Sequence, residues 1–279
     1  MMLADSHTVQ EHYCHGALLT SIEAFLRSRG IDPGHLTYQD LFVCDQMHGR
    51  GIEATREHIE HARITSGMRV LDIGCGIGGS SRCIAAEADC TVIGIDLTEE
   101  FVEVARELTM RCGLDDRIEF HAVDALDMPF DAGSFDHVWC HNVTMNISDK
   151  AALIAEIGRV LKDEGRFSCS ELALGEAGEP FYPLPWATRA EDSFLLTPEA
   201  MRALIEEGGL HVIEQMDTNE ANVPFSKEMQ ERAKRGEPLH SVNPMSFKLG
   251  DAFAEQVRNL IESATAGRLT EQLIVAMKK

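Results

Sequence analysis

A glycine-rich segment in the first third of the chain restricts the possible fold more than any other feature. It reads Val70-Leu71-Asp72-Ile73-Gly74-Cys75-Gly76-Ile77-Gly78-Gly79, beginning as a short apolar strand and leading into a predicted helix at 80–88. Glycine permits a sharp turn and the close approach of a ligand, and the amide groups at the helix N-terminus then face that ligand. The segment therefore predicts a ligand site where a strand of a parallel sheet turns into a helix.

Apolar strands alternate with helical patterns from this segment onward, and helical patterns precede it. The predicted strands are 69–73, 91–95, 118–123, 135–140, 165–170, 210–216 and 273–277. The predicted helices are 12–29, 52–63, 80–88, 99–111, 151–161, 197–207 and 251–264. Alternating units with buried strands are typical of a Rossmann-like α/β fold, in which helices cover both faces of a mostly parallel sheet.

The pattern also divides the chain into regions. Residues 1–63 are expected to form a helical N-terminal extension, which serves either as a lid or as a dimer arm, and residues 64–279 the main domain. Two stretches interrupt the main domain, the Gly- and Pro-rich 172–197 and the polar, Pro-punctuated 218–248. Because insertions late in such a fold lie near its ligand edge, both are candidate caps over a substrate.

Charge and composition exclude several classes of partner. The formal net charge is −21 and the isoelectric point about 4.9, so the surface repels nucleic acids and anionic membranes. No apolar run approaches the roughly 18 residues of a membrane span, and no secretory leader is visible, so we expect a cytoplasmic protein. The eight cysteines form no C-x-x-C pair, which predicts reduced core residues and no bound metal.

Three acidic residues follow three successive predicted strands. Asp72, Asp96 and Asp124 are expected to meet in one crevice, because open α/β sheets bind ligands at the carboxyl ends of their strands. Asp72 would repel the pyrophosphate of NAD but can hold a cationic amino group. Asp96 can accept hydrogen bonds from ribose hydroxyls, and Asp124 can accept one from an adenine amino group. A ligand with an amino acid end, a ribose and an adenine fits this set.

These motifs together resemble those of a known family. Val70 to Gly79, Gly94-Ile95-Asp96 and Asp124-Ala125 are similar to the cofactor motifs of class I S-adenosylmethionine-dependent methyltransferases. The resemblance extends over about residues 45–279. Asp45 to His48, Glu53 to Thr55, and Ser193 to Pro198 with Met201-Arg202 look like the subgroup of sarcosine/dimethylglycine and phosphoethanolamine N-methyltransferases. That subgroup includes natural-product enzymes, so it does not identify the acceptor.

The resemblance implies a seven-stranded sheet whose seventh strand is antiparallel, with S-adenosylmethionine as cofactor and S-adenosylhomocysteine as product. By resemblance, Gly74 and Gly76 line the cofactor and Asp72 supports its methionine end, over which Gln46 to His48 close. Asp96 would bind the ribose, and Asp124 with Ala125 the adenine. The full set of expected cofactor contacts is Gln46, Asp72, Gly74, Gly76, Gly78, Asp96, Leu97, Asp124, Ala125 and His141.

The candidate catalytic residues are His141, His48 and Asn146. His141 follows the fourth strand, where a neutral imidazole could remove a proton from the acceptor or merely contact the cofactor. His48 precedes a glycine and is a candidate lid residue. Asn146 can orient an acceptor but cannot act as its base. Phe181, Tyr182 and Trp186 are candidates for an aromatic cage around a methylated amine.

The predicted reaction is direct displacement of the methyl group onto a small-molecule acceptor. An amine nitrogen is favoured, because the sequence contains no evident acid–base pair and a neutral amine needs none. O- or C-methylation is the alternative. Outside this class, an NAD-dependent oxidoreductase and a cofactor-binding protein without activity stay open, although Asp72 and Asp124 count against NAD. A homodimer is compatible with the sequence.

Overall fold

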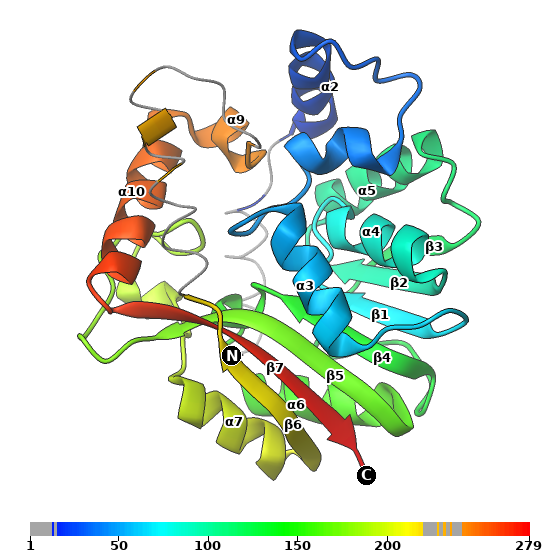
Figure 1. Cartoon of the computed structure of the whole chain (residues 1–279), viewed down its shortest axis with the longest axis vertical. Helices are drawn as coiled ribbons and strands as arrows, with labels where there is room; N and C mark the ends of the chain where they lie inside the picture. Colours follow the sequence, from blue (N-terminus) through cyan, green and yellow to red (C-terminus); the bar gives the residue numbers. More distant parts are fainter. Residues whose placement is uncertain (1–12, 14–15, 220–227, 229–230, 233–234, 236–241) are drawn as a thin grey trace.

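A seven-stranded sheet forms the centre of the molecule in the computed structural model, which describes residues 13, 16–219, 228, 231–232, 235 and 242–279 (Figure 1). Its strands are β1 (Arg69–Ile73), β2 (Thr91–Asp96), β3 (Ile118–Ala122), β4 (Phe135–His141), β5 (Leu161–Leu174), β6 (Leu210–Asp217) and β7 (Leu269–Lys278). Their order is β3-β2-β1-β4-β5-β7-β6, and β7 is antiparallel to both of its neighbours. The fold expected from the sequence is thus confirmed.

Helices cover both faces of the sheet (Figure 1). One face carries α3 (Ile52–Ala62), α4 (Gly79–Ala88) and α5 (Glu99–Arg111), and the other carries α6 (Lys150–Val160) and α7 (Pro198–Glu207). Thr197 caps α7, because its side chain accepts a hydrogen bond from Ala200 N and proline occupies the first turn.

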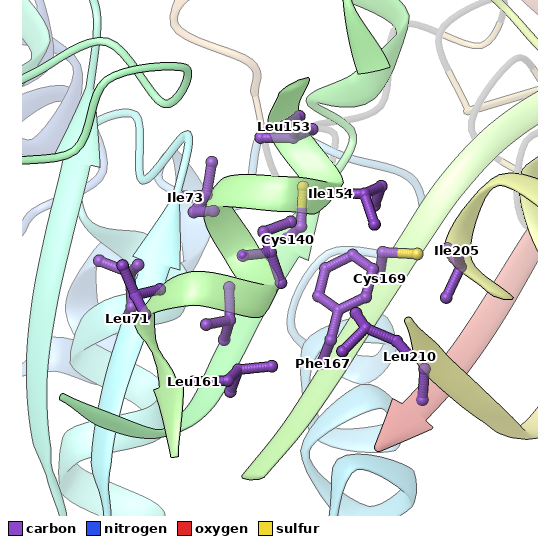
Figure 2. Close-up of a cluster of buried hydrophobic side chains, with 14 of the residues drawn as sticks. Leu71, Ile73, Cys140, Leu153, Ile154, Leu161, Phe167, Cys169, Ile205 and Leu210 are labelled. Carbon is purple, nitrogen blue, oxygen red and sulfur yellow. The ribbon is translucent and has the colours of Figure 1, made fainter. Parts of the chain in front are cut away.

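Alternation along the strands supplies a separate apolar core to each face. On β1, Val70 packs toward α4 and α5, whereas Leu71 and Ile73 pack toward α6. Figure 2 shows the second of these cores, where Phe167 and Cys169 of β5 lie among side chains of α6 and α7. The same alternation places Trp139 and His141 of β4 on the α3 face, because side chains of a strand point alternately to opposite faces.

Two strands are longer than their apolar runs predict. β5 and β7 pair from Arg166↔Met277 to Leu174↔Leu269, whereas the expected strands covered only 165–170 and 273–277. The missed part of β7 contains Thr270, Glu271 and Gln272, whose polar side chains hide the strand pattern in the sequence. Glu271 and Gln272 are nevertheless buried.

The N-terminal region is helical, as expected, and packs onto the main domain. Helix α2 (Leu18–Ser28) forms the later part of the predicted helix 12–29, of which residues 12, 14 and 15 lie outside the described residues. Before α2, Gly16 N and Leu18 N both donate to the Glu100 carboxylate. The short 3₁₀ helix η1 (Tyr38–Val43) follows, and α3 then contacts β5 and β7. A third apolar cluster joins α2 and η1 to α5, with Leu18, Ile22, Leu41 and Leu108 buried in it.

The first expected insertion, 172–197, packs against helix α10 (Asp251–Thr265). Within 172–197, Leu184 and Trp186 pack with Leu269 of β7, and Leu260 of α10 joins this cluster. Most of 218–248 lies outside the described residues, but its end forms the short helix α9 (Met245–Leu249). Two of the candidate cage residues lie in different environments: Phe181 is exposed beneath the Arg268 guanidinium, whereas Trp186 is buried.

Two general expectations concern cysteines and membranes. The seven cysteines in the described part of the chain are free thiols, six of them buried. Within that part, no helix combines the length and the apolar character required to cross a membrane.

A buried ion pair ties the N-terminal region to the main domain. Arg82 of α4 is fully buried, and its guanidinium donates to Asp45 Oδ2 at 3.0 Å and to Thr109 Oγ1 of α5 at 3.0 Å. The Asp45 carbonyl lies so close to Gly79 that a Cβ on Gly79 would overlap it. The start of α4 and the loop at Asp45 are therefore fitted to each other.

We expect Asp45→Asn to lower the free energy of unfolding by about 3 kcal/mol or more, because it leaves the buried Arg82 guanidinium without a counter-charge. Urea denaturation followed by circular dichroism measures the change. As a control, Glu206→Gln breaks the exposed Arg202–Glu206 pair and should cost no more than about 0.5 kcal/mol. Similar small losses in both variants would contradict the assigned role of Asp45.

Candidate active site

A cavity of about 1610 Å³ opens at the carboxyl ends of β1, β2 and β4. Pockets for single drug-sized ligands usually measure about 300–1,000 Å³, so this cavity has room for a cofactor and a second molecule. Its lining comes from the glycine-rich loop, the loop before α3, the turn after β4, and α10. Three of these four segments were expected from the sequence to surround the ligands.

The glycine-rich loop forms the floor of one part of the cavity. Gly74 and Gly76 line it, and both have positive φ angles, which only glycine adopts without strain. A Cβ on Gly74 would also overlap the Val143 side chain. Gly78 does not belong to the lining; it turns the backbone into α4 at φ 84° and packs against Arg82 and Phe120. The structure thus places Gly78 in the turn beside the cavity, and its cofactor contact stays a prediction.

The three expected acids all line the cavity. Asp96 Oδ2 accepts from Gly76 N at 3.0 Å and Asp96 Oδ1 from Thr98 N at 2.8 Å, which fixes the carboxylate and leaves lone pairs for a ligand. Asp124 Oδ1 accepts from Leu126 N at 2.9 Å, and the residue is exposed at the rim. Leu97 and Ala125 also line this part, beside Asp96 and Asp124.

Asp72 lies deepest among the three acids. Its Oδ2 accepts a 2.5 Å hydrogen bond from Ser81 Oγ of α4. Burial raises the pKa of Asp72 to about 7, and the neighbouring Asp96 charge adds to this increase. A ligand ammonium would stabilise the carboxylate, since an opposite charge favours the ionised form.

The loop before α3 brings Gln46 and His48 to the cavity. The Thr55 hydroxyl of α3 lies 2.6 Å from Gln46 Oε1 and 3.0 Å from His48 Nε2. His48 Nδ1 lies 3.1 Å from Gly49 O. Both ring nitrogens of His48 thus have polar neighbours, and burial lowers the pKa of His48 to about 4. The imidazole is therefore neutral and held in place.

His141 stacks on His48, with ring centroids 3.7 Å apart and planes 15° apart. The His141 side chain is buried and lines the cavity, yet within the described chain neither ring nitrogen has a hydrogen-bond partner. Burial lowers the pKa of His141 well below its usual value, and the neighbouring His48 and His58 add to this decrease. Leaving a buried polar group unpaired costs roughly 1–3 kcal/mol, so a ligand that paired with the ring would be stabilised by it.

Glu171, which sequence reasoning missed, holds the turn after β4. Its carboxylate accepts hydrogen bonds from Val143 N and from Thr144 N and Oγ1, and the Cys140 thiol donates to it at 3.2 Å. Burial raises the pKa of Glu171. An acid directly after the predicted strand 165–170 was a usable signal, and in the structure this acid stabilises the turn that follows His141 and carries Asn146.

The far part of the cavity is largely apolar. Asn146 lines it from the 3₁₀ turn η2 (Thr144–Asn146), and its Oδ1 accepts from Tyr13 Oη at 3.5 Å. Of the expected cage residues, only Trp186 contributes to the lining. The remaining apolar lining comes from the turn, from β5 and from α10: Met145, Leu172, Phe253, Val257, Leu260, Ile261 and Ala264.

S-adenosylmethionine fits these residues as a chemical set. The near part of the cavity offers a deep carboxylate for an ammonium, a fixed carboxylate for ribose hydroxyls and a rim carboxylate for an adenine amino group. Among the described residues, no group of three or more His, Cys, Asp or Glu side chains is arranged to hold a metal ion.

A family comparison gives the same result. The family described as "Methyltransferase domain" matches residues 64–256, more than half of the chain. The chain belongs to this family, and it is a class I S-adenosylmethionine-dependent methyltransferase.

Individual relatives differ in their reactions. Methyltransferase GfsG of Streptomyces halstedii is 28% identical over 71% of this chain and 73% of its own length. Phosphoethanolamine N-methyltransferase 1 of Arabidopsis thaliana is 33% identical over 50% of this chain, but only 28% of that protein is covered. Other relatives are described as O- and C-methyltransferases. The relatives thus share methyl transfer and differ in the atom that accepts the methyl group.

A solved structure matches nearly the whole chain. The [4+2]-cyclase SpnF aligns with a TM-score of 0.70 at 20% identity, covering 98% of this chain and 96% of its own. Likeness at this level of identity concerns the fold alone. The N-terminal region and α10 therefore belong to an arrangement that occurs in another protein.

We expect the affinity for S-adenosylmethionine to rise between pH 5.5 and pH 7.5, by up to about tenfold per pH unit below the pKa of Asp72. The raised pKa keeps the carboxyl protonated at low pH, and only the ionised form attracts the ammonium, so binding releases a proton. Calorimetric titration in buffers of different ionisation enthalpy measures both effects. Asp72→Asn should bind more weakly and lose the pH dependence; a dependence that survives in this variant would exclude Asp72 as its source.

We expect Asp124→Ala to weaken S-adenosylmethionine binding more than tenfold, which corresponds to about 1.4 kcal/mol, because the adenine amino group loses its acceptor. The same titration of Asp116→Ala is the control, since Asp116 is an exposed carboxylate before β3, at the opposite end of that strand. Unchanged affinity in Asp124→Ala would show that adenine binds elsewhere.

Proposed function

We propose that this enzyme transfers a methyl group from S-adenosylmethionine to a hydroxyl group of a small, largely apolar molecule, with His141 as general base. The observation that most supports this function is the buried His141 ring, whose two nitrogens lack a partner in the described chain although the residue lines the cavity. A neutral imidazole is in the protonation state that can accept a proton.

The change of acceptor from the sequence expectation has a physical reason. An amine was favoured because no base was evident, and a neutral amine attacks a methyl group without one. A hydroxyl group benefits from proton removal as it attacks, and His141 supplies the acceptor for that proton. The apolar lining from Met145, Leu172 and α10 supports a substrate with a mainly hydrocarbon body.

Bound S-adenosylmethionine supplies a methyl group already activated on a sulfonium. The protein then has to align the acceptor and exclude water. Asp72, Asp96 and Asp124 would hold the cofactor, and Asn146 would orient the acceptor from η2. His48 would keep the His141 ring in one plane by stacking, while His141 accepts the hydroxyl proton on a ring nitrogen.

Three further assignments accompany this proposal. Residues 1–63 would act as a lid over the cofactor, and 172–197 with 218–248 would cap the acceptor. The small-molecule acceptor would be the main partner, with no role for nucleic acid. A cytoplasmic location and a homodimer stay predictions from the sequence.

The acceptor atom is identified by offering apolar phenols and alcohols together with amines of the same carbon skeleton, such as 4-butylphenol and 4-butylaniline. Mass spectrometry of the products should find methyl ethers. If the amines are methylated and the hydroxyl compounds are not, the acceptor atom is nitrogen. Methylation at carbon would indicate a C-methyltransferase.

We expect His141→Asn to lower the single-turnover rate with the preferred hydroxyl acceptor by about 10²–10⁴-fold, the usual contribution of a general base. Because the pKa of His141 is lowered, the base is neutral above pH 6.5, and this residue should add no pH dependence between pH 6.5 and 8. Rapid-quench kinetics with S-adenosylmethionine saturating give the rate. His211→Asn, an exposed histidine on β6, is the control; a retained rate in His141→Asn would reduce His141 to a contact residue.

A further inference from the structure

A row of aromatic side chains adjoins His141 on the α3 face of the sheet. His137, Trp139 and His141 alternate along β4 and therefore share that face. His58 of α3 covers the row: its ring stacks on Trp139 with centroids 3.5 Å apart, and it meets the His141 ring at 71° with centroids 5.5 Å apart. His58, His137 and Trp139 are at most 1% exposed and lie outside the lining of the cavity. None of the three is needed by the reaction as proposed.

Four buried nitrogens of this row have no hydrogen-bond partner in the described chain. They are His58 Nδ1, Trp139 Nε1 and both ring nitrogens of His141. Buried polar groups that do not bond to protein are commonly paired by an ordered water with two to four polar neighbours. Two hydrogen bonds of about 2.9 Å each can cross the gap between the His58 and His141 rings through one water. Such a water would pair three of the nitrogens and leave one nitrogen of His141 for the acceptor.

The Ser168 hydroxyl of β5 couples two of these histidines. Its Oγ lies 2.8 Å from His58 Nε2 and 2.8 Å from His137 Nε2. Burial lowers the pKa of His58 well below its usual value and that of His137 to about 3, so both rings are neutral and carry one N–H each. The hydroxyl can donate to only one of the two rings, so the other ring must donate to the hydroxyl. With every proton paired, one ring carries its proton on Nε2 and the other on Nδ1.

We propose that His58 is a positioning residue that sets the tautomer of His141, by accepting the hydrogen bond of its inward-facing N–H through one buried water. This inference rests on the proposed function, because it takes His141 as the base. A base needs a bare nitrogen toward the acceptor, so the proton of the neutral His141 ring lies on its other nitrogen. The water then accepts from this N–H and from Trp139 Nε1, which can only donate, and itself donates to His58 Nδ1.

This pairing determines the proton positions along the row. His58 Nδ1 is bare, because both lone pairs of the water are taken by His141 and Trp139 and a third donor would stay unpaired. His58 therefore donates from Nε2 to Ser168, and Ser168 donates to His137 Nε2.

The same arrangement accounts for every proton during methyl transfer. The acceptor O–H bond breaks, and its proton moves to the bare nitrogen of His141. The electron pair of the oxygen forms the bond to the methyl carbon, while the pair of the carbon–sulfur bond stays on sulfur. His141 keeps its inward N–H bonded to the water throughout, and the proton that it has gained leaves to solvent in the cavity.

The first test observes the tautomers of the wild type. Enzyme labelled with ¹⁵N-histidine and saturated with S-adenosylhomocysteine gives long-range ¹H–¹⁵N spectra at pH 7.5, in which protonated and bare ring nitrogens differ in chemical shift. His58 should carry its proton on Nε2, and His137 should carry its proton on Nδ1. The variants His58→Asn and His137→Asn assign the signals. A proton on His58 Nδ1, or on His137 Nε2, would overturn the proposal.

Variants separate positioning from packing. His58→Leu, which offers no acceptor to the water, should lower the single-turnover rate of hydroxyl methylation by about 10–100-fold, the usual loss when the group that orients a histidine is removed. Its affinity for S-adenosylhomocysteine should stay within about twofold. His58→Asn places an amide oxygen close to the position of Nδ1 and should recover part of the rate.

The matched control is His61→Asn, which changes another histidine of α3, one that pairs with Glu214 instead of the row. It should keep the wild-type rate. Equal rates in His58→Leu and His61→Asn would overturn the proposal, and the wild-type spectra decide the matter if His58→Leu does not fold.

Failure of the proposed base and failure of the role of His58 give different results. A normal single-turnover rate in His141→Asn rejects the base and, with it, the positioning role, whatever the tautomers are. A slow His141→Asn together with a proton on His58 Nδ1 retains the base and rejects only the role of His58. A slow His141→Asn together with the expected tautomers and a slow His58→Leu supports both.

Discussion

The fully buried guanidinium of Arg82 connects the parts of the molecule on which the site depends. Arg82 belongs to α4, the helix that follows the glycine-rich loop. Its guanidinium donates hydrogen bonds to Asp45 in the loop before α3 and to Thr109 of α5. Because an unpaired buried charge is very unfavourable, the packing of these three segments is cooperative: each needs the other two in position. The loop that begins at Asp45 carries Gln46 and His48, so the position of the His48–His141 stack follows from this ion pair.

Acidic side chains and neutral imidazoles line different parts of the cavity, an arrangement that is complementary to a cationic cofactor. Acids whose pKa values are raised by burial, Asp72 and Asp96, lie where an ammonium and a ribose would bind. At the proposed transfer point the side chains are the neutral His48 and His141, whose pKa values are lowered by burial. A protonated imidazole would repel a sulfonium, whereas a neutral one can accept a proton beside it. The burial that raises the pKa values of the acids therefore also keeps both imidazoles neutral.

The sequence predicted that three acids at strand ends meet in one cavity, and it predicted little of the apolar part of that cavity. Asp72, Asp96 and Asp124 could be located because each ends a short apolar strand, and the carboxyl ends of parallel strands meet at one edge. Its place among glycines predicts a ligand contact for Gly78, and the structure adds a second reason for glycine there, the positive φ angle and the packing against Phe120. The stack of His141 on His48 depends on how the loop before α3 folds back, which no local pattern encodes.

Glu271, which lines the cavity from β7, illustrates why the acceptor part of the cavity is hard to predict from the sequence. The rule that located the other acids searches the carboxyl ends of strands, but β7 is antiparallel and meets that edge with its amino end. Residues 270–272 near the start of β7 are polar, so the apolar run in the sequence marks only the later part of the strand. The acceptor lining combines this strand with α10, the turn after β4 and Trp186, segments that are far apart in the chain. Relatives described as N-, O- and C-methyltransferases are compatible with this division, since segments that are far apart in the chain can change without altering the strand ends beside the glycine-rich loop.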